Sequence, residues 1–272
     1  MFNPSKSSTW SVYQGGSWEI SYGDGSSASG TVGYDKVTIG GATVTKQAVE
    51  IATAVSGSFI EDTANDGLVG LAFSTINTVQ PEAQKTWFEN IMSELDQPVF
   101  TANLETTAGG SYTFGKIDAT EYSGDIHYTP INKENGFWQF DSNTYSIGGT
   151  SSQCTTCSPA IADTGTSLIL LDEDVVEAYY KQISSASYNS EQGGYVYDCD
   201  ADLPALGVAI GTYTATLNSS QITFAQVDSN SCFGGLQSNS GGGIQIMGDM
   251  LLKHYFAVFD GGNEQFGIAD KA

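Results

Sequence analysis

Basic residues are scarce in this 272-residue sequence: nine Lys and Arg stand against 31 Asp and Glu, and the formal net charge is −22. So negative a chain repels phosphate, which argues against nucleic acid and anionic membranes as partners. No apolar run approaches the roughly 18 residues of a membrane span, so no membrane partner is expected. The 40% hydrophobic fraction argues against wholesale disorder. The excess of carboxylates suits an acidic environment, where protonation would reduce self-repulsion.

Histidine is also rare, and this limits the hydrolytic mechanisms open to the chain. His127 and His254 are the two histidines, and neither lies in a nucleophile motif. A Ser/His or Cys/His site is therefore not predicted, and both rings are expected to be structural. The glycine run 241–243 lacks the Lys-Ser/Thr of a phosphate-binding loop.

Cysteines are few and even in number, which favours two disulfides in a secreted, extracellular protein. Cys154-Thr-Thr-Cys157 leaves three interpretations open: a structural disulfide or free thiols, half a zinc site, or a thioredoxin-type motif. No matching C-x-x-C supports zinc, and no βαβ pattern supports a redox motif. We expect no metal. Asn218-Ser219-Ser220 is a possible glycosylation sequon.

Short runs rich in Thr, Val, Ile, Tyr and Phe, broken by turn residues, predict a mostly β protein. Helical periodicity is confined to Pro81–Leu95, with Pro81 in the first turn, and to Asp172–Ile183. The predicted strands are Ser17–Tyr22, Gly30–Ile39, Thr43–Ala52, Ser111–Phe114, Gly194–Tyr197 and Gln221–Phe224.

A weak internal echo predicts two related lobes. Asp66-Gly67-Leu68-Val69-Gly70-Leu71 is similar to Gln245-Ile246-Met247-Gly248-Asp249-Met250, and each precedes a segment consistent with a short helix. The boundary is expected near Thr129–Asn132, which gives lobes of residues 1–130 and 131–272.

One carboxylate stands apart as a candidate for catalysis. Asp163 follows an apolar strand and precedes Thr164-Gly165-Thr166-Ser167, whose hydroxyls and amides can hold an ionised carboxylate. An ordinary Asx turn at the end of a strand would give the same triplet.

Its context favours catalysis, because the whole chain resembles the pepsin-like aspartic endopeptidases, particularly secreted fungal ones. The motifs that carry the resemblance are Phe2-Asn3-Pro4-Ser5, Ile20–Ser26, Asp66–Leu71, Phe114–Asp118, Asp163–Ser167 and Ile246–Asp249. The resemblance implies a bilobal, mostly β acid protease fold with a few short helices. It implies a monomer that acts on proteins or peptides without a cofactor.

The resemblance also assigns roles to individual residues. It makes Asp163 one of two catalytic aspartates and Tyr22 the tyrosine of a flap that closes over substrate. It places Gly23 and Asp24 in the flap as substrate-binding residues. It places Gly165 and Thr166 on the opposite side of the substrate. It also implies a disulfide between Cys199 and Cys232. The Asp24 carboxylate further suggests tolerance for a basic side chain beside the cut bond.

The sequence departs from the family pattern because the D-T/S-G motif occurs once and not twice. Asp163 precedes Ile246 by 83 positions, and the same offset from Leu68 falls before residue 1. We therefore expect an N-terminally truncated first lobe, with the other catalytic aspartate in an upstream segment. Such a chain should be impaired or inactive alone, and it could associate through the truncated lobe.

Two alternatives remain at this point. A non-catalytic peptide-binding or scaffold protein of pepsin-like fold would keep the flap and half of the cleft. A self-paired dimer would form its carboxylate pair from two copies of Asp163.

Overall fold

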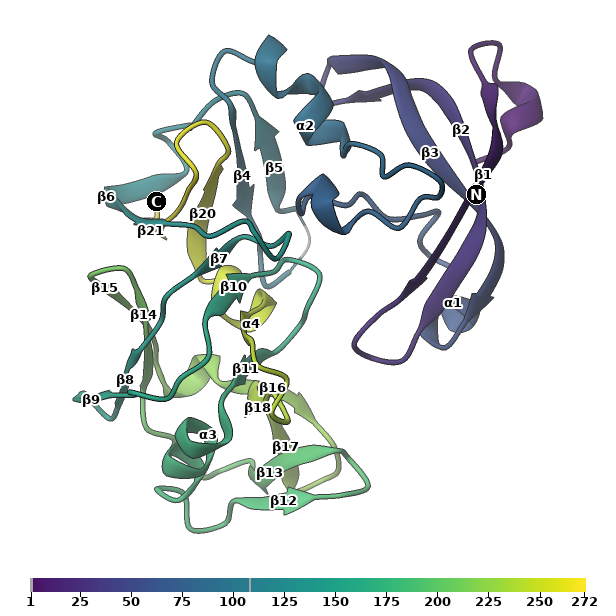
Figure 1. The fold of residues 1–272 in the computed structure, drawn as a ribbon. Helices are drawn as coiled ribbons and strands as arrows, with labels where there is room; N and C mark the ends of the chain where they lie inside the picture. Colours follow the sequence, from purple (N-terminus) through teal and green to yellow (C-terminus); the bar gives the residue numbers. More distant parts are fainter. Residues whose placement is uncertain (1, 108) are drawn as a thin grey trace. The chain divides into compact units, whose positions relative to one another are not determined.

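The computed structural model describes residues 2–107 and 109–272, and the chain is mostly β, as the sequence predicts (Figure 1). The four α-helices found in these residues are short: α1 (Ser58–Glu61), α2 (Trp87–Ile91), α3 (Glu173–Tyr180) and α4 (Asp249–Leu252). The 3₁₀ turns are η1 (Pro4–Lys6), η2 (Ser74–Ile76), η3 (Met92–Glu94) and η4 (Ser219–Gln221).

The strands of the first half are β1 (Ser11–Ser21), β2 (Ser27–Ile39), β3 (Ala42–Ser56), β4 (Val99–Asn103), β5 (Ser111–Phe114), β6 (Tyr122–Pro130), β7 (Gln139–Phe140), β8 (Thr144–Ile147), β9 (Thr150–Gln153) and β10 (Ala160–Ala162). Those of the second half are β11 (Ile169–Leu171), β12 (Ser187–Asn189), β13 (Gly194–Asp198), β14 (Leu206–Ile210), β15 (Tyr213–Leu217), β16 (Thr223–Gln226), β17 (Ser231–Gly234), β18 (Leu236–Ser238), β19 (Gln245–Met247), β20 (Tyr255–Asp260) and β21 (Gln265–Lys271).

The chain divides into two units, and each is described by itself. The first unit runs to Pro98 and includes Lys133–Phe137, whereas the second holds Val99–Asn132 and Trp138–Ala272. Strands β4 to β6 belong to the second unit because β4 pairs with β20 and β6 pairs with β21. The contacts therefore place this segment with the C-terminal strands, and the division into lobes of residues 1–130 and 131–272 stays a prediction.

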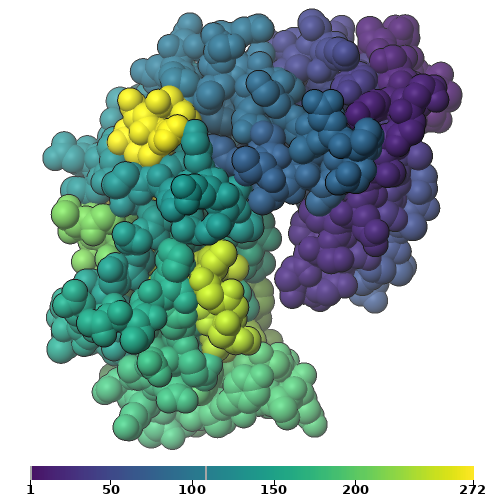
Figure 2. Space-filling view, viewed as in Figure 1, coloured from purple at the N-terminus to yellow at the C-terminus, as the bar shows by residue number. Residues whose placement is uncertain are grey.

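The first unit is built on an antiparallel sheet in the order β1-β2-β3, whose strands form a contiguous purple and blue block in Figure 2. One cluster of its core consists of the buried residues Trp18, Val32 and Val79, with partly buried neighbours around them. The Trp18 indole nitrogen donates a hydrogen bond to the Thr31 carbonyl at 3.1 Å, which satisfies its buried polar group. This hydrogen bond joins β1 to β2 at the buried Trp18 side chain.

The second unit contains the sheet that carries Asp163, in the order β18-β11-β19-β10-β7. Strand β19 lies between β10, with which it is parallel, and β11, with which it is antiparallel. All three residues of β10 are buried, as expected for a short apolar strand covered on both faces. The strand that leads into Asp163 is therefore rigidly held.

A second five-stranded sheet, β5-β4-β20-β21-β6, is packed on aromatic rings. Phe100 stacks on Phe259 with ring centroids 4.4 Å apart, and every residue of β20 is buried.

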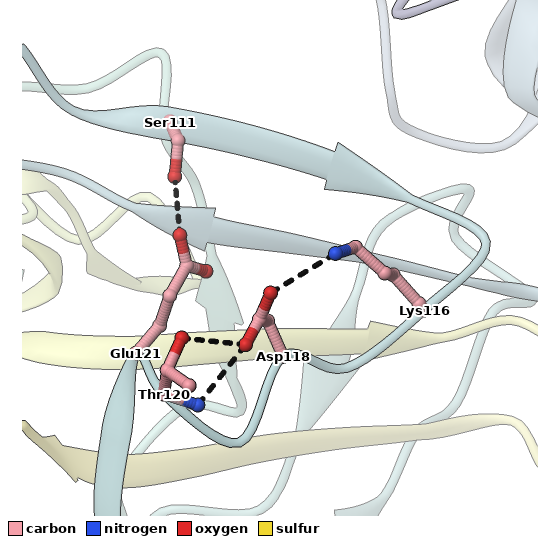
Figure 3. A network of polar contacts seen from close by, with 5 residues as sticks. All are labelled: Ser111, Lys116, Asp118, Thr120 and Glu121. Atoms are coloured by element: carbon pink, nitrogen blue, oxygen red, sulfur yellow. Dashed lines mark hydrogen bonds and ion pairs between the residues drawn. The ribbon is translucent and has the colours of Figure 1, made fainter.

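The Phe114–Asp118 motif forms the turn after β5, where Asp118 accepts hydrogen bonds from Thr120 and from Lys116 at 2.9 Å (Figure 3). The Thr120 hydroxyl is the main reason that the pKa of Asp118 lies below its usual range. This motif therefore shapes a turn.

The predicted helix over Pro81–Leu95 is wrong at its N-terminus. Helix α2 begins at Trp87, because Thr86 accepts a hydrogen bond from the Glu89 amide and the Glu89 carboxylate accepts one from the Thr86 amide. This capping box fixes the start six residues after Pro81. The predicted strand over Gln221–Phe224 is also partly wrong, since Gln221 ends η4 and β16 begins at Thr223.

Both cysteine pairs form disulfides, Cys154–Cys157 and Cys199–Cys232. The Cys199–Cys232 pairing confirms what the resemblance implies. The Cys154–Cys157 bridge shows that these two cysteines are paired with one another and are not free thiols. Among the described residues, no helix is long and apolar enough to cross a membrane.

Candidate functional site

Asp163 stands at the end of β10, and the turn that follows it holds its carboxylate from two sides. Its Oδ1 accepts a hydrogen bond from the Gly165 amide at 2.9 Å, and its Oδ2 accepts one from the Thr166 hydroxyl at 2.7 Å. The Asp163 amide donates to the Met247 carbonyl at 3.1 Å. The predicted trio of Asp163, Gly165 and Thr166 is thus brought together in the second unit, in one oriented and half-buried carboxylate site.

The turn is locked to α4 through Gly248. The Asp249 amide donates to the Thr166 carbonyl at 2.8 Å, and the Met250 amide donates to the Ser167 carbonyl at 2.9 Å. A Cβ added at Gly248 would lie 2.3 Å from the carbonyl oxygens of both Thr166 and Leu168. Only glycine permits this close approach of the two backbones.

A second carboxyl, that of Asp249, lies close enough to Asp163 to be affected by its charge. Burial, and after it the negative charge of Asp163, raise the pKa of Asp249 to about 6, although the positive charge of Lys253 acts in the opposite direction. Its Oδ1 is buried and has no hydrogen-bond partner among the described residues. Asp249 lies in the Ile246–Asp249 motif, but its raised pKa could not be predicted from the sequence, because burial is not visible in a linear pattern.

The raised pKa of Asp249 gives an expected pH dependence of stability. The folded protein binds this proton more tightly than the unfolded chain, so the stabilisation is complete below about pH 4 and is lost as the pH rises through about 6. Because the residue is only half-buried, we expect the loss to be about 1–2 kcal/mol, less than the full shift would give. Asp249→Asn should therefore equal the wild type at pH 4 and exceed it by about 1 kcal/mol at pH 7.

Urea unfolding followed by near-UV circular dichroism at pH 4, 5, 6 and 7 measures this difference. Subtracting the variant's free energy of unfolding from that of the wild type at each pH cancels the contributions of the other carboxylates that titrate in the same range. A wild-type protein that gains stability relative to Asp249→Asn as the pH rises would contradict the expected sign.

A pocket of about 440 Å³ lies beside Asp249 in the second unit. Tyr112, Phe224 and Met250 give it apolar walls, and Lys253 supplies a positive charge. Burial raises the pKa of Tyr112, while a hydrogen bond with Thr164 lowers it. Tyr112 is thus a neighbour of the Asp163 turn that sequence reasoning missed, because it lies on β5, far away in the sequence.

The predicted flap residues come together in the first unit, at the tip of the β1–β2 hairpin. The Tyr22 amide donates to the Ser26 carbonyl at 2.8 Å, and the half-exposed Tyr22 ring meets Phe59 edge-on, with centroids 5.5 Å apart. Asp24 accepts hydrogen bonds from the Ser26 amide at 2.9 Å and from the Ser26 hydroxyl at 2.8 Å. These two bonds, the amide first, lower the pKa of Asp24. Gly23 is exposed beside them.

The two halves of the internal echo differ sharply in their surroundings. In the second unit, Met247 is 0% exposed and Gly248 is enclosed by backbone. In the first unit, the corresponding Leu68 and Val69 are 67% and 58% exposed, and nothing lies within 4 Å of a Cβ added at Gly70. The Leu68–Gly70 segment thus lacks, among the described residues, the covering that β10 and the Asp163 turn give to β19.

The other candidate residues have local roles. His127 stacks on Tyr213 with centroids 4.2 Å apart, and His254 lies 3.0 Å from Gln221, with a pKa that burial lowers. Asn218 is an exposed N-cap of η4, where it accepts a hydrogen bond from Ser220, and its glycosylation stays a prediction. No cluster of metal-ligating residues occurs in the part of the chain that the structure describes.

Known proteins with similar sequences are aspartic proteases. A sequence model described as eukaryotic aspartyl protease matches residues 1–271. Penicillopepsin-1 of Talaromyces stipitatus is 53% identical over 97% of this chain and 68% of its own length. Aspergillopepsin-1 of Aspergillus oryzae is 52% identical over 95% of this chain and 66% of its own length. The chain therefore spans about two thirds of the length of these curated relatives.

The fold is similar to a solved structure as well. The crystal structure of the aspartic proteinase from Irpex lacteus matches 98% of this chain and 84% of its own chain, with a TM-score of 0.83 and 27% sequence identity. The predicted mostly β, pepsin-like fold is thereby confirmed.

Proposed function

Because this chain belongs to the eukaryotic aspartyl protease family, we propose that it takes part in the hydrolysis of peptide bonds at acid pH through a carboxylate pair in which Asp163 is one member. The observation that supports this most directly is the Asp163 carboxylate itself. It stands at the end of a buried strand and is oriented by the Gly165 amide and the Thr166 hydroxyl.

The chemistry requires two carboxyl groups that share one proton, since two like charges at contact distance cannot both ionise cheaply. The ionised member takes a proton from water, which attacks the scissile carbonyl, and the protonated member polarises that carbonyl. The two donors on Asp163 fix where its oxygens point, as a general base requires. Gly165 and Thr166 are proposed to contact the substrate.

The residues at the tip of the β1–β2 hairpin are proposed to bind substrate as well. Tyr22 is proposed to close over a bound peptide, and Gly23 and Asp24 to form hydrogen bonds with it. Support comes from the exposure of all three residues in a turn whose base is fixed by backbone hydrogen bonds. Proteins and peptides are the proposed partners.

The 272-residue chain alone is proposed to be impaired or inactive. It contains one D-T/S-G motif, and the Leu68–Gly70 segment lacks the covering that its counterpart has. The test is hydrolysis of a denatured protein at pH 3–5 by the purified chain, with an intact relative as the positive control. Little or no hydrolysis is expected. Efficient hydrolysis that a statine-type inhibitor blocks and Asp163→Asn abolishes would overturn this part of the proposal.

A binding measurement beside the hydrolysis assay distinguishes a non-catalytic protein from an impaired protease. A labelled substrate-like peptide that binds without turnover, equally well in Asp163→Asn, would identify a peptide-binding protein. Activity that rises with the square of protein concentration would instead indicate a pair made from two copies of Asp163.

We propose secretion as the setting, on the strength of two disulfides and a net charge of −22. The family resemblance favours a monomer. When the chain is expressed alone, the exposed Leu68 and Val69 are where association is expected to begin.

Asp24 is proposed to favour substrates with lysine beside the cut bond. Its hydrogen bonds to Ser26 lower its pKa, so the carboxylate keeps its negative charge to a lower pH than an ordinary aspartate does and can attract an ammonium group. In a form that carries the second catalytic aspartate, Asp24→Ala should reduce cleavage at lysine sites about 10-fold relative to apolar sites. Paired peptides that differ only at this position measure the ratio, and Asp24→Asn is the matched control for shape. An unchanged ratio would contradict the role.

A further inference from the structure

The tip of the β1–β2 hairpin is joined to α1, which follows β3 in the chain. Ser27 of β2 pairs with Ser56, the last residue of β3, and the two hydroxyl oxygens lie 2.7 Å apart. Beyond this pair the chain turns through Gly57, which has a φ of 61°, and enters α1 at Ser58. The first residue of α1 thereby reaches the turn that contains Asp24.

Glycine at position 57 permits this approach. A Cβ added at Gly57 would lie 2.7 Å from the hydroxyl oxygen of Ser26 and 2.8 Å from its Cα. Because the two backbones come so close, the Ser58 amide can donate a hydrogen bond to the Ser26 hydroxyl oxygen at 3.1 Å. Ser26 is 2% exposed, so this hydrogen bond is shielded from water.

The hydroxyl of Ser58 also takes part in holding the Asp24 carboxylate. Asp24 Oδ2 accepts hydrogen bonds from the Ser26 hydroxyl at 2.8 Å and from the Ser58 hydroxyl at 3.1 Å, and the two hydroxyl oxygens lie 2.7 Å apart. Each hydroxyl has one proton, so Ser58 donates either to Asp24 directly or to Ser26, whose own proton then goes to Asp24. In both arrangements the Ser58 proton strengthens the hydrogen bonding to the carboxylate.

These hydrogen bonds favour the ionised form of Asp24. The Ser26 amide lowers the pKa of Asp24 most, the Ser26 hydroxyl follows, and the Ser58 hydroxyl acts in the same direction, while burial opposes them. The titratable neighbours on these two elements are Tyr22 in the turn and Glu61 in α1. The described residues shift the pKa of Asp24 through hydrogen bonds and burial, and not through charge.

We propose that Ser58 is a positioning residue, which holds the Asp24 carboxylate ionised and in one orientation and thereby sharpens the preference for lysine beside the cut bond. This inference rests on the proposed role of Asp24 in substrate binding. Ser58 acts through Asp24 and Ser26 and is assigned no contact with the substrate. An ammonium group gains most from a carboxylate whose charge and direction are fixed before the substrate arrives.

The hold on Asp24 is tested in the 272-residue chain, where no hydrolysis is needed. NMR detection of side-chain carboxyl carbons during a pH titration measures the pKa of Asp24, whose signal is identified by its loss in Asp24→Asn. We expect this pKa to rise in Ser58→Ala and to return toward the wild-type value in Ser58→Thr, which keeps a hydroxyl. Ser58 is exposed, so both variants should fold.

Ser56→Ala is the matched control. It removes the hydroxyl that lies against Ser27 on the same hairpin, one position away from Gly57, and it should leave the pKa of Asp24 unchanged. An unchanged pKa of Asp24 in Ser58→Ala, or an equal rise in Ser56→Ala, would overturn the proposal.

The effect on specificity is measured in a form that carries the second catalytic aspartate, with peptides that differ only in lysine or an apolar residue beside the cut bond. We expect Ser58→Ala to lower the lysine-to-apolar ratio of kcat/KM about 3-fold at pH 4, and Ser56→Ala to keep it. A ratio that falls in Asp24→Ala but not in Ser58→Ala would overturn the positioning role of Ser58 alone. A ratio unchanged in both would overturn the lysine-binding role of Asp24, and the effect of Ser58 on specificity with it.

Discussion

Replacing Asp163 by Asn is expected to lower acid hydrolysis by about 10³-fold or more in a form of the protein that carries the second catalytic aspartate. An amide cannot take a proton from water, although it can keep the geometry, since its Oδ1 can still accept the hydrogen bond from the Gly165 amide. Initial rates on a denatured protein at pH 4 measure the loss. The circular dichroism spectrum should stay unchanged, which separates lost chemistry from lost fold.

Asp249→Asn is the matched control, because Asp249 is a nearby carboxyl whose pKa is raised partly by the charge of Asp163. We expect it to keep hydrolysis within about 10-fold and to move the pH profile. A larger loss of rate in Asp249→Asn than in Asp163→Asn would reverse the proposed assignment of the base.

Gly248→Ala is expected to destabilise the second unit by about 2–4 kcal/mol. The new Cβ would lie 2.3 Å from the carbonyl oxygens of Thr166 and Leu168, and both are backbone atoms that cannot rotate away. The Asp163 turn must then separate from α4, which breaks the hydrogen bond from the Asp249 amide to the Thr166 carbonyl. Urea unfolding at pH 5 measures the change.

The internal echo supplies the control. Gly70 occupies the corresponding place in the first unit, where an added Cβ meets nothing within 4 Å, so Gly70→Ala should change stability by no more than about 0.5 kcal/mol. Equal losses in the two variants would contradict the difference in their surroundings.

Local patterns were sufficient wherever one strand or one turn decides the structure. The run Ser111–Phe114 is a strand with the predicted bounds, and the Asp163 turn forms where hydroxyls and glycine follow an apolar strand. The start of α2 differs from the prediction because the capping box of Thr86 and Glu89 sets the first turn, and Pro81 does not. The Thr-x-x-Glu spacing of this capping box is visible in the sequence.

Other features depend on contacts between distant segments and could not be predicted. The assignment of β4 and β5 to the second unit depends on the pairing of β4 with β20, more than 150 residues away. The raised pKa of Asp249 depends on burial, and the proximity of Tyr112 to Thr164 depends on how β5 is placed. The hydrophobic pattern within a single segment does not indicate which distant segment packs against it.

Asp163 is proposed to be one half of a catalytic carboxylate pair, so its effect on activity should depend on the presence of a second catalytic aspartate. The 272-residue chain is compared with the same chain extended at its N-terminus by a relative's segment that contains a second Asp-Thr/Ser-Gly motif, each with and without Asp163→Asn. Hydrolysis of a denatured protein at pH 4 is measured for all four. We expect at least 10³-fold more activity in the extended chain than in the other three proteins. Equal activity in the extended chain with and without Asp163→Asn would contradict it.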